Sequence, residues 1–316
     1  MLLRLAERTL IFLVSLVVSS VFVFGFMVLL PGDPAKVALG TNATPESVAA
    51  LREEFGLNRP LLEQFLSWAG GLVRLDPGVS YISRAEIGPQ LADRLQVSLI
   101  LVLASMLIAV TIALPLGTLM AVHHRSTLGL GLSALSQVGV AVPAFLAGIL
   151  LITVFAVQLR WLPAGGWVPP AYNPVEFLRH LLLPALSLGL IQGAVLTRYV
   201  RSAVLDVLRE DYLRTARAKG LTPMRALVRH GLRNAAVPVV TVLGLQLATL
   251  LVGAVVIERV FVIPGLGSML LDAVGNRDLL VVQDVVMVLV VAVLLVNFVV
   301  DLLYVVIDPR LRTGAR

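Results

Sequence analysis

Six long apolar stretches, separated by polar segments, dominate the 316-residue chain. Each stretch is close to the ~20 residues that a helix needs to cross the ~30 Å hydrocarbon core of a bilayer. Because lipid offers no partner for backbone amides, stretches this long are expected to be helices. The pattern predicts an all-α polytopic membrane protein with six transmembrane helices, over residues 9–30, 97–122, 132–157, 181–200, 235–257 and 285–307.

The composition agrees with lipid as the main solvent. Hydrophobic residues make up 58% of the chain and charged residues 14%, and the mean hydropathy is +0.95. A soluble domain of this size could not bury so much apolar surface. This excludes a soluble enzyme, a disordered chain and a nucleic-acid-binding domain. The chain has no cysteine, which also excludes disulfides, thiol catalysis and cysteine-ligated metals.

The first stretch has the basic start of a secretory signal, because Arg4 and Arg8 precede it. Its apolar run exceeds 20 residues, whereas the core of a signal peptide has about 7–15. No cleavage site of small residues follows the run. We therefore expect a retained membrane anchor.

The charges between the stretches predict the orientation. If both termini are cytoplasmic, 15 of the 25 lysines and arginines lie inside and 13 of the 19 acidic residues lie outside. This bias follows the rule that positive residues are retained on the cytoplasmic side, and it accounts for the net charge of +6. The inside count includes Arg310, Arg312 and Arg316.

The outer connection, residues 31–96, contains two predicted helices. Thr44 followed by Pro45 is typical of a helix start, and Gly56 ends this first helix. A second, amphipathic helix starts at Pro60. Its apolar side is formed by Leu61, Leu62, Phe65, Leu66 and Ala69. Helices this short need support, so they either cap the outer ends of the spans or form a docking surface for an extracellular partner.

The inner connection, residues 201–234, is too polar for lipid but keeps a helical spacing of apolar residues. The fourth span is therefore predicted to continue as a helix until Gly220. Thr222 and Pro223 begin a second helix. The apolar faces are predicted to be Leu205, Leu208, Tyr212, Leu213 and Ala216 in the first helix, and Met224, Leu227, Val228 and Leu232 in the second, beside a basic row of Arg225, Arg229 and Arg233.

This helix–glycine–helix elbow has two interpretations. Its basic row could lie on anionic lipid headgroups. Alternatively, Ala216 and Gly220 form a small-residue face, beside the apolar Leu221, that another protein can approach closely. A lipid-surface helix would carry bulky anchors there, so the sequence favours a protein contact.

No catalytic, cofactor or metal constellation is apparent in the sequence. The four histidines, His123, His124, His180 and His230, lack a metal-ligand spacing, and no phosphate-binding G-x-x-x-x-G-K-[ST] loop is present. Gly189 and Gly193 indicate close helix packing or, with Pro184, a flexing point.

Polar residues within the predicted spans are mostly uncharged. Gln192, Gln246 and Asn297 either form hydrogen bonds between helices or line a translocation path. An uncharged path suits a carrier of varied peptides, because fixed charges would discriminate among side chains.

The elbow and several other segments resemble one family of transport proteins. Residues 211–221 and 229–240 are similar to the cytoplasmic signature loop of importer-type ABC permeases, in its oligopeptide and dipeptide form. Where the general signature has Glu-Ala-Ala, this chain has Arg214, Thr215 and Ala216. Further matching motifs are residues 32–35, 56–61, 162–167, 264–267, 276–278, 301–304 and 308–310. The chain is most similar to the B-type peptide permease subunit.

The resemblance implies a type I importer permease in a prokaryotic inner membrane. Its elbow would be a coupling helix held by an ATPase subunit, through Arg214, Thr215, Ala216, Arg217, Lys219, Gly220, Leu221 and Pro223. The implied partners are a second, different permease chain, two ABC ATPase subunits that bind ATP and Mg, an extracytoplasmic solute-binding protein and a di- or oligopeptide. The chain itself is expected to have no enzymatic activity, no cofactor and no nucleic-acid partner.

Two other functional classes remain open on the residues alone. A secondary transporter driven by an ion gradient usually buries several ionisable groups near the midplane, whereas Asp301 is the one clear acid within a predicted span. An intramembrane enzyme would need a nucleophile paired with a base. The resemblance also leaves nickel, glutathione or haem open as cargo.

Overall fold

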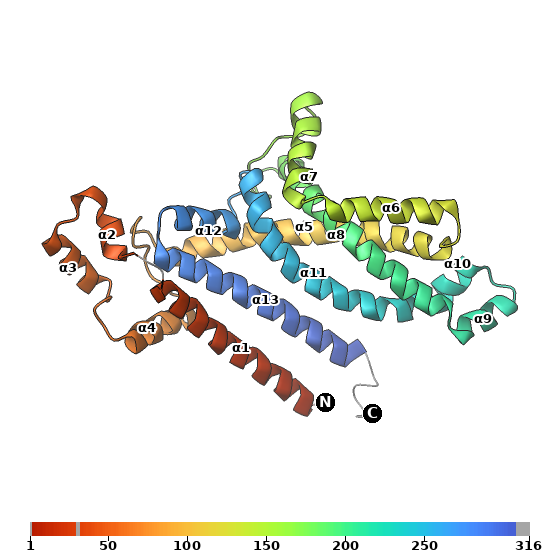
Figure 1. The fold of residues 1–316 in the computed structure, drawn as a ribbon, viewed down its shortest axis with the longest axis horizontal. Helices are drawn as coiled ribbons and strands as arrows, with labels where there is room; N and C mark the ends of the chain where they lie inside the picture. Colours follow the sequence, from red (N-terminus) through yellow and green to blue (C-terminus); the bar gives the residue numbers. More distant parts are fainter. Residues whose placement is uncertain (1, 30–31, 308–316) are drawn as a thin grey trace. The chain divides into compact units, whose positions relative to one another are not determined.

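The computed structural model describes residues 2–29 and 32–307 (Figure 1). These residues form helices and no strands, which confirms the predicted all-α fold. Arg310, Arg312, Arg316 and the motif at 308–310 lie outside the described residues. The long helices are α1 (Leu2–Leu29), α5 (Ile87–Val122), α8 (Pro174–Leu208), α11 (Leu232–Val260) and α13 (Leu279–Ile307). The shorter helices are α2 (Pro34–Leu39), α3 (Pro45–Glu54), α4 (Leu61–Val73), α6 (Thr127–Ala141), α7 (Ala144–Leu151), α9 (Asp211–Ala218), α10 (Pro223–Ala226) and α12 (Leu266–Gly275), with a 3₁₀ turn at Gly40–Asn42 and π-helical segments at Ile152–Gln158 and Leu227–Gly231.

Within residues 2–29 and 32–307, five helices are long and apolar enough to cross a bilayer, and a bent pair makes a sixth candidate span. The pair consists of α6 followed by α7 with its π-helical extension, and the two parts meet at an angle of 98°. The single helix predicted over 132–157 is therefore wrong. Pro143 explains the bend, because proline lacks an amide hydrogen and forces the preceding Val142 into an extended conformation, here with ψ 123°.

Several spans continue beyond the predicted apolar stretches. The helix predicted from residue 97 begins at Ile87, and the helix predicted from 181 begins at Pro174. Asn173 caps that start by accepting hydrogen bonds from the amides of Val175 and Glu176. Hydropathy marks the part of a helix that suits lipid, whereas capping residues decide where the helix ends.

Contacts within the chain divide it into two compact units. The central unit comprises Leu99–Ile263 and the described part of Val296–Arg316. The N-terminal unit comprises Leu2–Ser98 and Pro264–Leu295.

Helix α8 organises the central unit, in which it contacts α6, α7 and, most extensively, α11 (Figure 1). Glycines allow α8 and α5 to approach closely. A Cβ atom added to Gly189 would lie 2.8 Å from Ile108, and one added to Gly117 would lie 2.7 Å from Val200. The close packing predicted for Gly189 is therefore observed.

The N-terminal unit contains the two predicted helices of the 31–96 connection. Helix α3 begins at a capping box. The side-chain oxygen of Thr44 accepts a hydrogen bond from the backbone amide of Ser47, and the side-chain oxygen of Ser47 accepts one from the backbone amide of Thr44. In α4 the predicted apolar side is partly wrong. Trp68 is the buried residue, at 8% exposure, and it lies in an aromatic cluster with Phe65 and Phe24 of α1. The predicted inward residues Leu61, Leu62 and Leu66 are 57%, 67% and 59% exposed.

Candidate functional site

The elbow between α8 and α11 consists of α9, α10 and the π-helical segment Leu227–Gly231. The predicted continuation of the fourth span as one helix to Gly220 is wrong, because α8 ends at Leu208. Glu210 then adopts an extended conformation, with ψ 142°, and precedes the first residue of α9. The break allows α9 to leave the direction of α8.

One side of the elbow packs into the chain's own core. Leu213, Ala216 and Leu227 are at most 9% exposed and belong to one cluster with Val204 and Val207 of α8. Gly231 permits this contact, since an added Cβ atom would lie 2.9 Å from Val207 and 3.2 Å from Leu213. The cluster also includes Ala235 and Val239 of α11, so it attaches the elbow to both neighbouring helices.

Two predicted faces of the elbow need correction. Ala216 points into the core, so it does not share an open small-residue face with Gly220. In the second helix Leu227 is buried, whereas Met224, Val228 and Leu232 are 38%, 59% and 38% exposed. The buried face is formed by Leu227 with the small residues Ala226 and Gly231, so the bulky apolar residues do not mark it.

The other side of the elbow is open and carries several cations. Arg214, Thr215, Arg217, Lys219, Gly220 and Pro223 are exposed, and Leu221 is half-buried against the cluster. Gly220 has a φ of +92°, a conformation that other residues rarely adopt, and an added Cβ atom would meet nothing within 4 Å. Arg214 forms an ion pair with Asp211 at 3.4 Å, with both side chains largely in solvent. This side is therefore free for a partner.

The uncharged polar residues predicted to line a path lie in different surroundings. Gln246 of α11 is 5% exposed, and neither its amide nitrogen nor its amide oxygen has a hydrogen-bond partner. Gln192 of α8 is half-buried, and Asn297 of α13 is exposed. No hydrogen bond joins any two of these three described residues, and their role in a path stays a prediction.

The 162–167 motif holds the chain between α7 and α8 against the end of α11. The amide of Gly166 donates to the carbonyl of Phe261 at 2.8 Å. A Cβ atom added to Gly165 would lie only 2.4 Å from the same carbonyl oxygen. Two successive glycines are therefore needed for this backbone contact.

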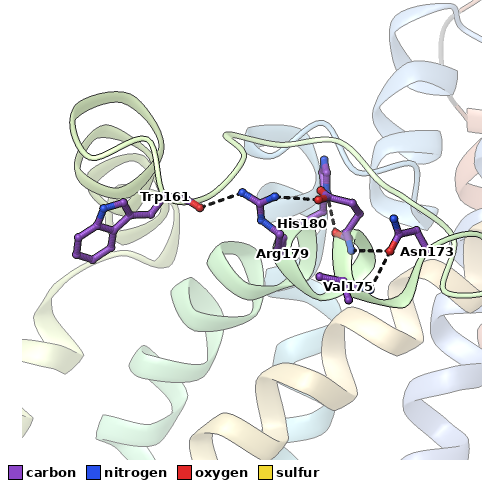
Figure 2. Close-up of polar contacts among 6 residues, drawn as sticks. Trp161, Asn173, Val175, Arg179 and His180 are labelled. Carbon is purple, nitrogen blue, oxygen red and sulfur yellow. Dashed lines mark hydrogen bonds and ion pairs between the residues drawn. The ribbon is translucent and has the colours of Figure 1, made fainter.

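A second set of contacts attaches the same connection to the start of α8 (Figure 2). Arg179 donates one hydrogen bond to the carbonyl of Trp161 at 3.2 Å and another to Glu176 at 2.8 Å. Sequence reasoning did not identify this arginine. Its position one turn after the Asn173-Pro174 helix start was the available signal.

The N-terminal unit contains buried carboxylates that the sequence pattern did not identify. Trp68 donates to Asp284 at 2.8 Å, and the hydroxyl of Ser80 donates to Asp278. Asp284 is fully buried and Asp278 is 5% exposed. Burial, followed by the charges of Asp284 and Asp278, raises the pKa of the nearby Tyr81. Among the described residues, no group of three or more His, Cys, Asp or Glu could hold a metal ion.

Comparison with known families decides the assignment of the chain. The family of binding-protein-dependent transport system inner membrane components matches residues 113–313, and the N-terminal region of such components matches residues 1–102. The chain belongs to this family. The two matches together cover the elbow and the 31–96 connection.

Curated relatives are similar over nearly the whole length of this permease. A probable peptide ABC transporter permease, y4tP of Sinorhizobium fredii, is 39% identical over 92% of the chain and 93% of the relative. The glutathione transport system permease GsiC of Escherichia coli K12 is 39% identical over 97% of both chains. GsiC of Salmonella paratyphi A is 40% identical over 97% of both chains.

Solved structures support the same fold. An inward-facing structure of the MetNI methionine ABC transporter has a TM-score of 0.58 and 21% identity, and it covers 69% of this chain and 96% of the solved chain. A second match, a crystal structure of an amino acid ABC transporter with histidines, has a TM-score of 0.50 and 17% identity. At these identities the likeness establishes the permease fold alone.

Proposed function

We propose that this chain is a transmembrane permease subunit of an ATP-driven importer of di- or oligopeptides, and that it forms half of the translocation path. Its similarity at 39% identity to a peptide permease and to a glutathione permease, over more than nine-tenths of the chain, carries the proposal. Glutathione is itself a peptide-like substrate. The half-buried and buried amides of Gln192 and Gln246 suit the amide groups that all peptides share.

The assembly that we propose contains a second, different permease chain, two ATPase subunits and a solute-binding protein outside. The family description, binding-protein-dependent transport, supports the solute-binding partner. Helix α1 agrees with a second membrane-embedded partner, since it leaves large apolar side chains uncovered, such as Phe22 at 73% and Leu29 at 82% exposure. ATP and Mg would be bound by the ATPase subunits, and both termini of this chain would be cytoplasmic.

The elbow is the coupling element of this proposal. Its open side, including Arg214, Arg217 and Lys219, would contact an ATPase subunit, and its cationic character favours a partner surface with carboxylates. Its buried side joins Leu213 and Leu227 to α8 and α11 in one close-packed cluster. Because a packed cluster resists deformation, displacement of the elbow would be transmitted to both spans.

A pair of substitutions at Gly220 tests this coupling in the reconstituted importer. Gly220→Trp places a large side chain where the structure leaves open space, and it should reduce ATP-dependent uptake strongly while the chain still inserts in the membrane. Gly220→Ala is the matched control, because it introduces the same strain at φ +92° without the bulk. Normal uptake by the tryptophan variant, or equal loss in both variants, contradicts a partner contact at this glycine.

A second measurement separates the proposal from transport driven by an ion gradient. Uptake should stop when the chain is assembled with ATPase subunits that cannot hydrolyse ATP. Uptake that continues under an imposed proton or sodium gradient would contradict the ATP-driven mechanism.

A further inference from the structure

The N-terminal unit contains an open cavity of about 920 Å³. Its wall includes Phe24 and Val28 near the end of span α1, and Leu280 and Gln283 in the first turns of span α13. Since both spans cross the membrane and end at this cavity, the cavity lies at the depth of the phospholipid headgroups on that side. The opposite face of α4 exposes Leu62 and Leu66, which agrees with a helix that lies at the membrane surface.

The charged residues around the cavity leave two cations unpaired. Arg52 forms an ion pair with Asp33 at 2.9 Å, and Arg84 forms one with Glu54 at 2.7 Å. The third acid of the wall, Asp76, accepts a hydrogen bond from the backbone amide of Gly78 at 3.2 Å. The remaining arginines of the wall are Arg59 and Arg74, and neither forms an ion pair with another residue in the described ranges.

Gln283 adds an unsatisfied hydrogen-bond donor to the same wall. Its side chain is 7% exposed, and its amide nitrogen has no acceptor among the described residues. A buried donor without an acceptor is costly, so such a group usually marks a place that a water molecule, an ion or a ligand occupies. Gln283 lines the same cavity as Arg59 and Arg74.

The rim of the cavity offers an apolar surface next to these donors. Leu61 and Val28 belong to the wall and are 57% and 46% exposed, and Phe24 and Trp68 lie beside them. A free inorganic anion would gain nothing from this surface. An anion that carries hydrocarbon chains would cover it, and each buried methylene group would contribute favourably.

We propose that this cavity binds an anionic phospholipid of the adjacent leaflet. Its phosphate is held by Arg59 and Arg74, and its acyl chains lie over Leu61 and Val28. Guanidinium groups suit this ligand because they donate paired hydrogen bonds to phosphate oxygens. The inference is independent of the proposed cargo and of the coupling mechanism, because it concerns a site far along the sequence from the elbow.

Native mass spectrometry of the full-length chain with its co-purified subunits tests the site. The protein is titrated with phosphatidylglycerol and, separately, with phosphatidylcholine of the same acyl chains, and retained lipid is counted. The unaltered chain should retain phosphatidylglycerol about tenfold more strongly than phosphatidylcholine, and Arg59→Gln with Arg74→Gln should abolish that preference. Arg277→Gln, which removes an exposed arginine of the same unit outside the cavity, should leave it unchanged.

Three results would overturn the proposal. The first is equal retention of the two lipids by the unaltered chain, and the second is an equal loss of preference in Arg277→Gln. The third is displacement of the lipid by equimolar glycerol phosphate, which would identify a soluble anion as the ligand.

Discussion

The elbow and the N-terminal unit differ in whether their buried polar atoms have hydrogen-bond partners. Within residues 211–231 no buried side-chain nitrogen or oxygen lacks a partner, because the buried side is apolar and the charges point to solvent. The N-terminal unit instead buries Asp278, Gln283 and Asp284, and each has one atom without a partner. The elbow is held by apolar packing against α8 and α11, which needs no buried polar partner. A segment whose buried polar atoms lack hydrogen-bond partners is suited to bind a ligand.

The largest effect on stability is expected from truncating a core side chain of the elbow. Leu227→Ala removes a fully buried side chain and should lower the free energy of unfolding by about 2–5 kcal/mol. The neighbouring Val228→Ala, at a position that is 59% exposed, should change it by less than about 0.5 kcal/mol. Thermal unfolding of the detergent-solubilised protein measures both. Equal shifts would show that the elbow does not pack as described.

A smaller effect is expected in the N-terminal unit from the bond between Trp68 and Asp284. Trp68→Phe keeps most of the aromatic contact with Phe24 but leaves a buried carboxylate oxygen without its donor, which should cost about 1–3 kcal/mol. Trp161→Phe, at a ring that is 63% exposed, provides the control in the same unfolding measurement. A Trp68→Phe variant as stable as the control would show that this hydrogen bond does not stabilise the fold.

The smallest effect is a pH dependence that arises from Tyr81. Burial and the carboxylates of Asp284 and Asp278 raise its pKa above the usual 10.0. The folded protein therefore holds this proton more tightly than the unfolded chain does. The corresponding stabilisation is complete below pH 10 and is lost as the pH rises through the raised pKa of the folded state.

Tyr81→Phe tests this dependence, since it should flatten the fall in the unfolding temperature above pH 10. Tyr172→Phe removes a phenol that is 90% exposed and should leave the curve unchanged. An unaltered curve in Tyr81→Phe would mean that the phenol is not held in a buried, acidic environment.

The parts of the fold that lipid dictates could be predicted from the sequence. Apolar stretches of membrane-spanning length identified the spans, and local capping chemistry identified the starts of α3 and α10 at Thr44 and Thr222. The cap of α8 at Asn173 was not identified. The signal for the bend at Pro143 was also present in the sequence. Proline is tolerated within α5, α8 and α11, so its presence alone does not decide between a bend and a straight span.

The packed face of the second part of the elbow could not be predicted from its large apolar residues, because the small residues Ala226 and Gly231 lie beside Leu227 on the buried side. The polar cluster of the N-terminal unit was inaccessible for another reason. Trp68 and Asp284 are 216 residues apart, and only the packing of α4 against the start of α13 brings them together. Pairings of this kind depend on tertiary structure and leave no local pattern.

The contact between Gly166 and Phe261 has a mechanical consequence for the central unit. Helices α8 and α11 are joined at one end by the elbow, and at the other end the 162–167 connection holds α11 to the start of α8. Because the two helices are held together at both ends, they resist separation at either end. A displacement at either end is therefore expected to tilt α8 and α11 together over about 50 Å, the length of α8, and so to reach the far side of the bilayer.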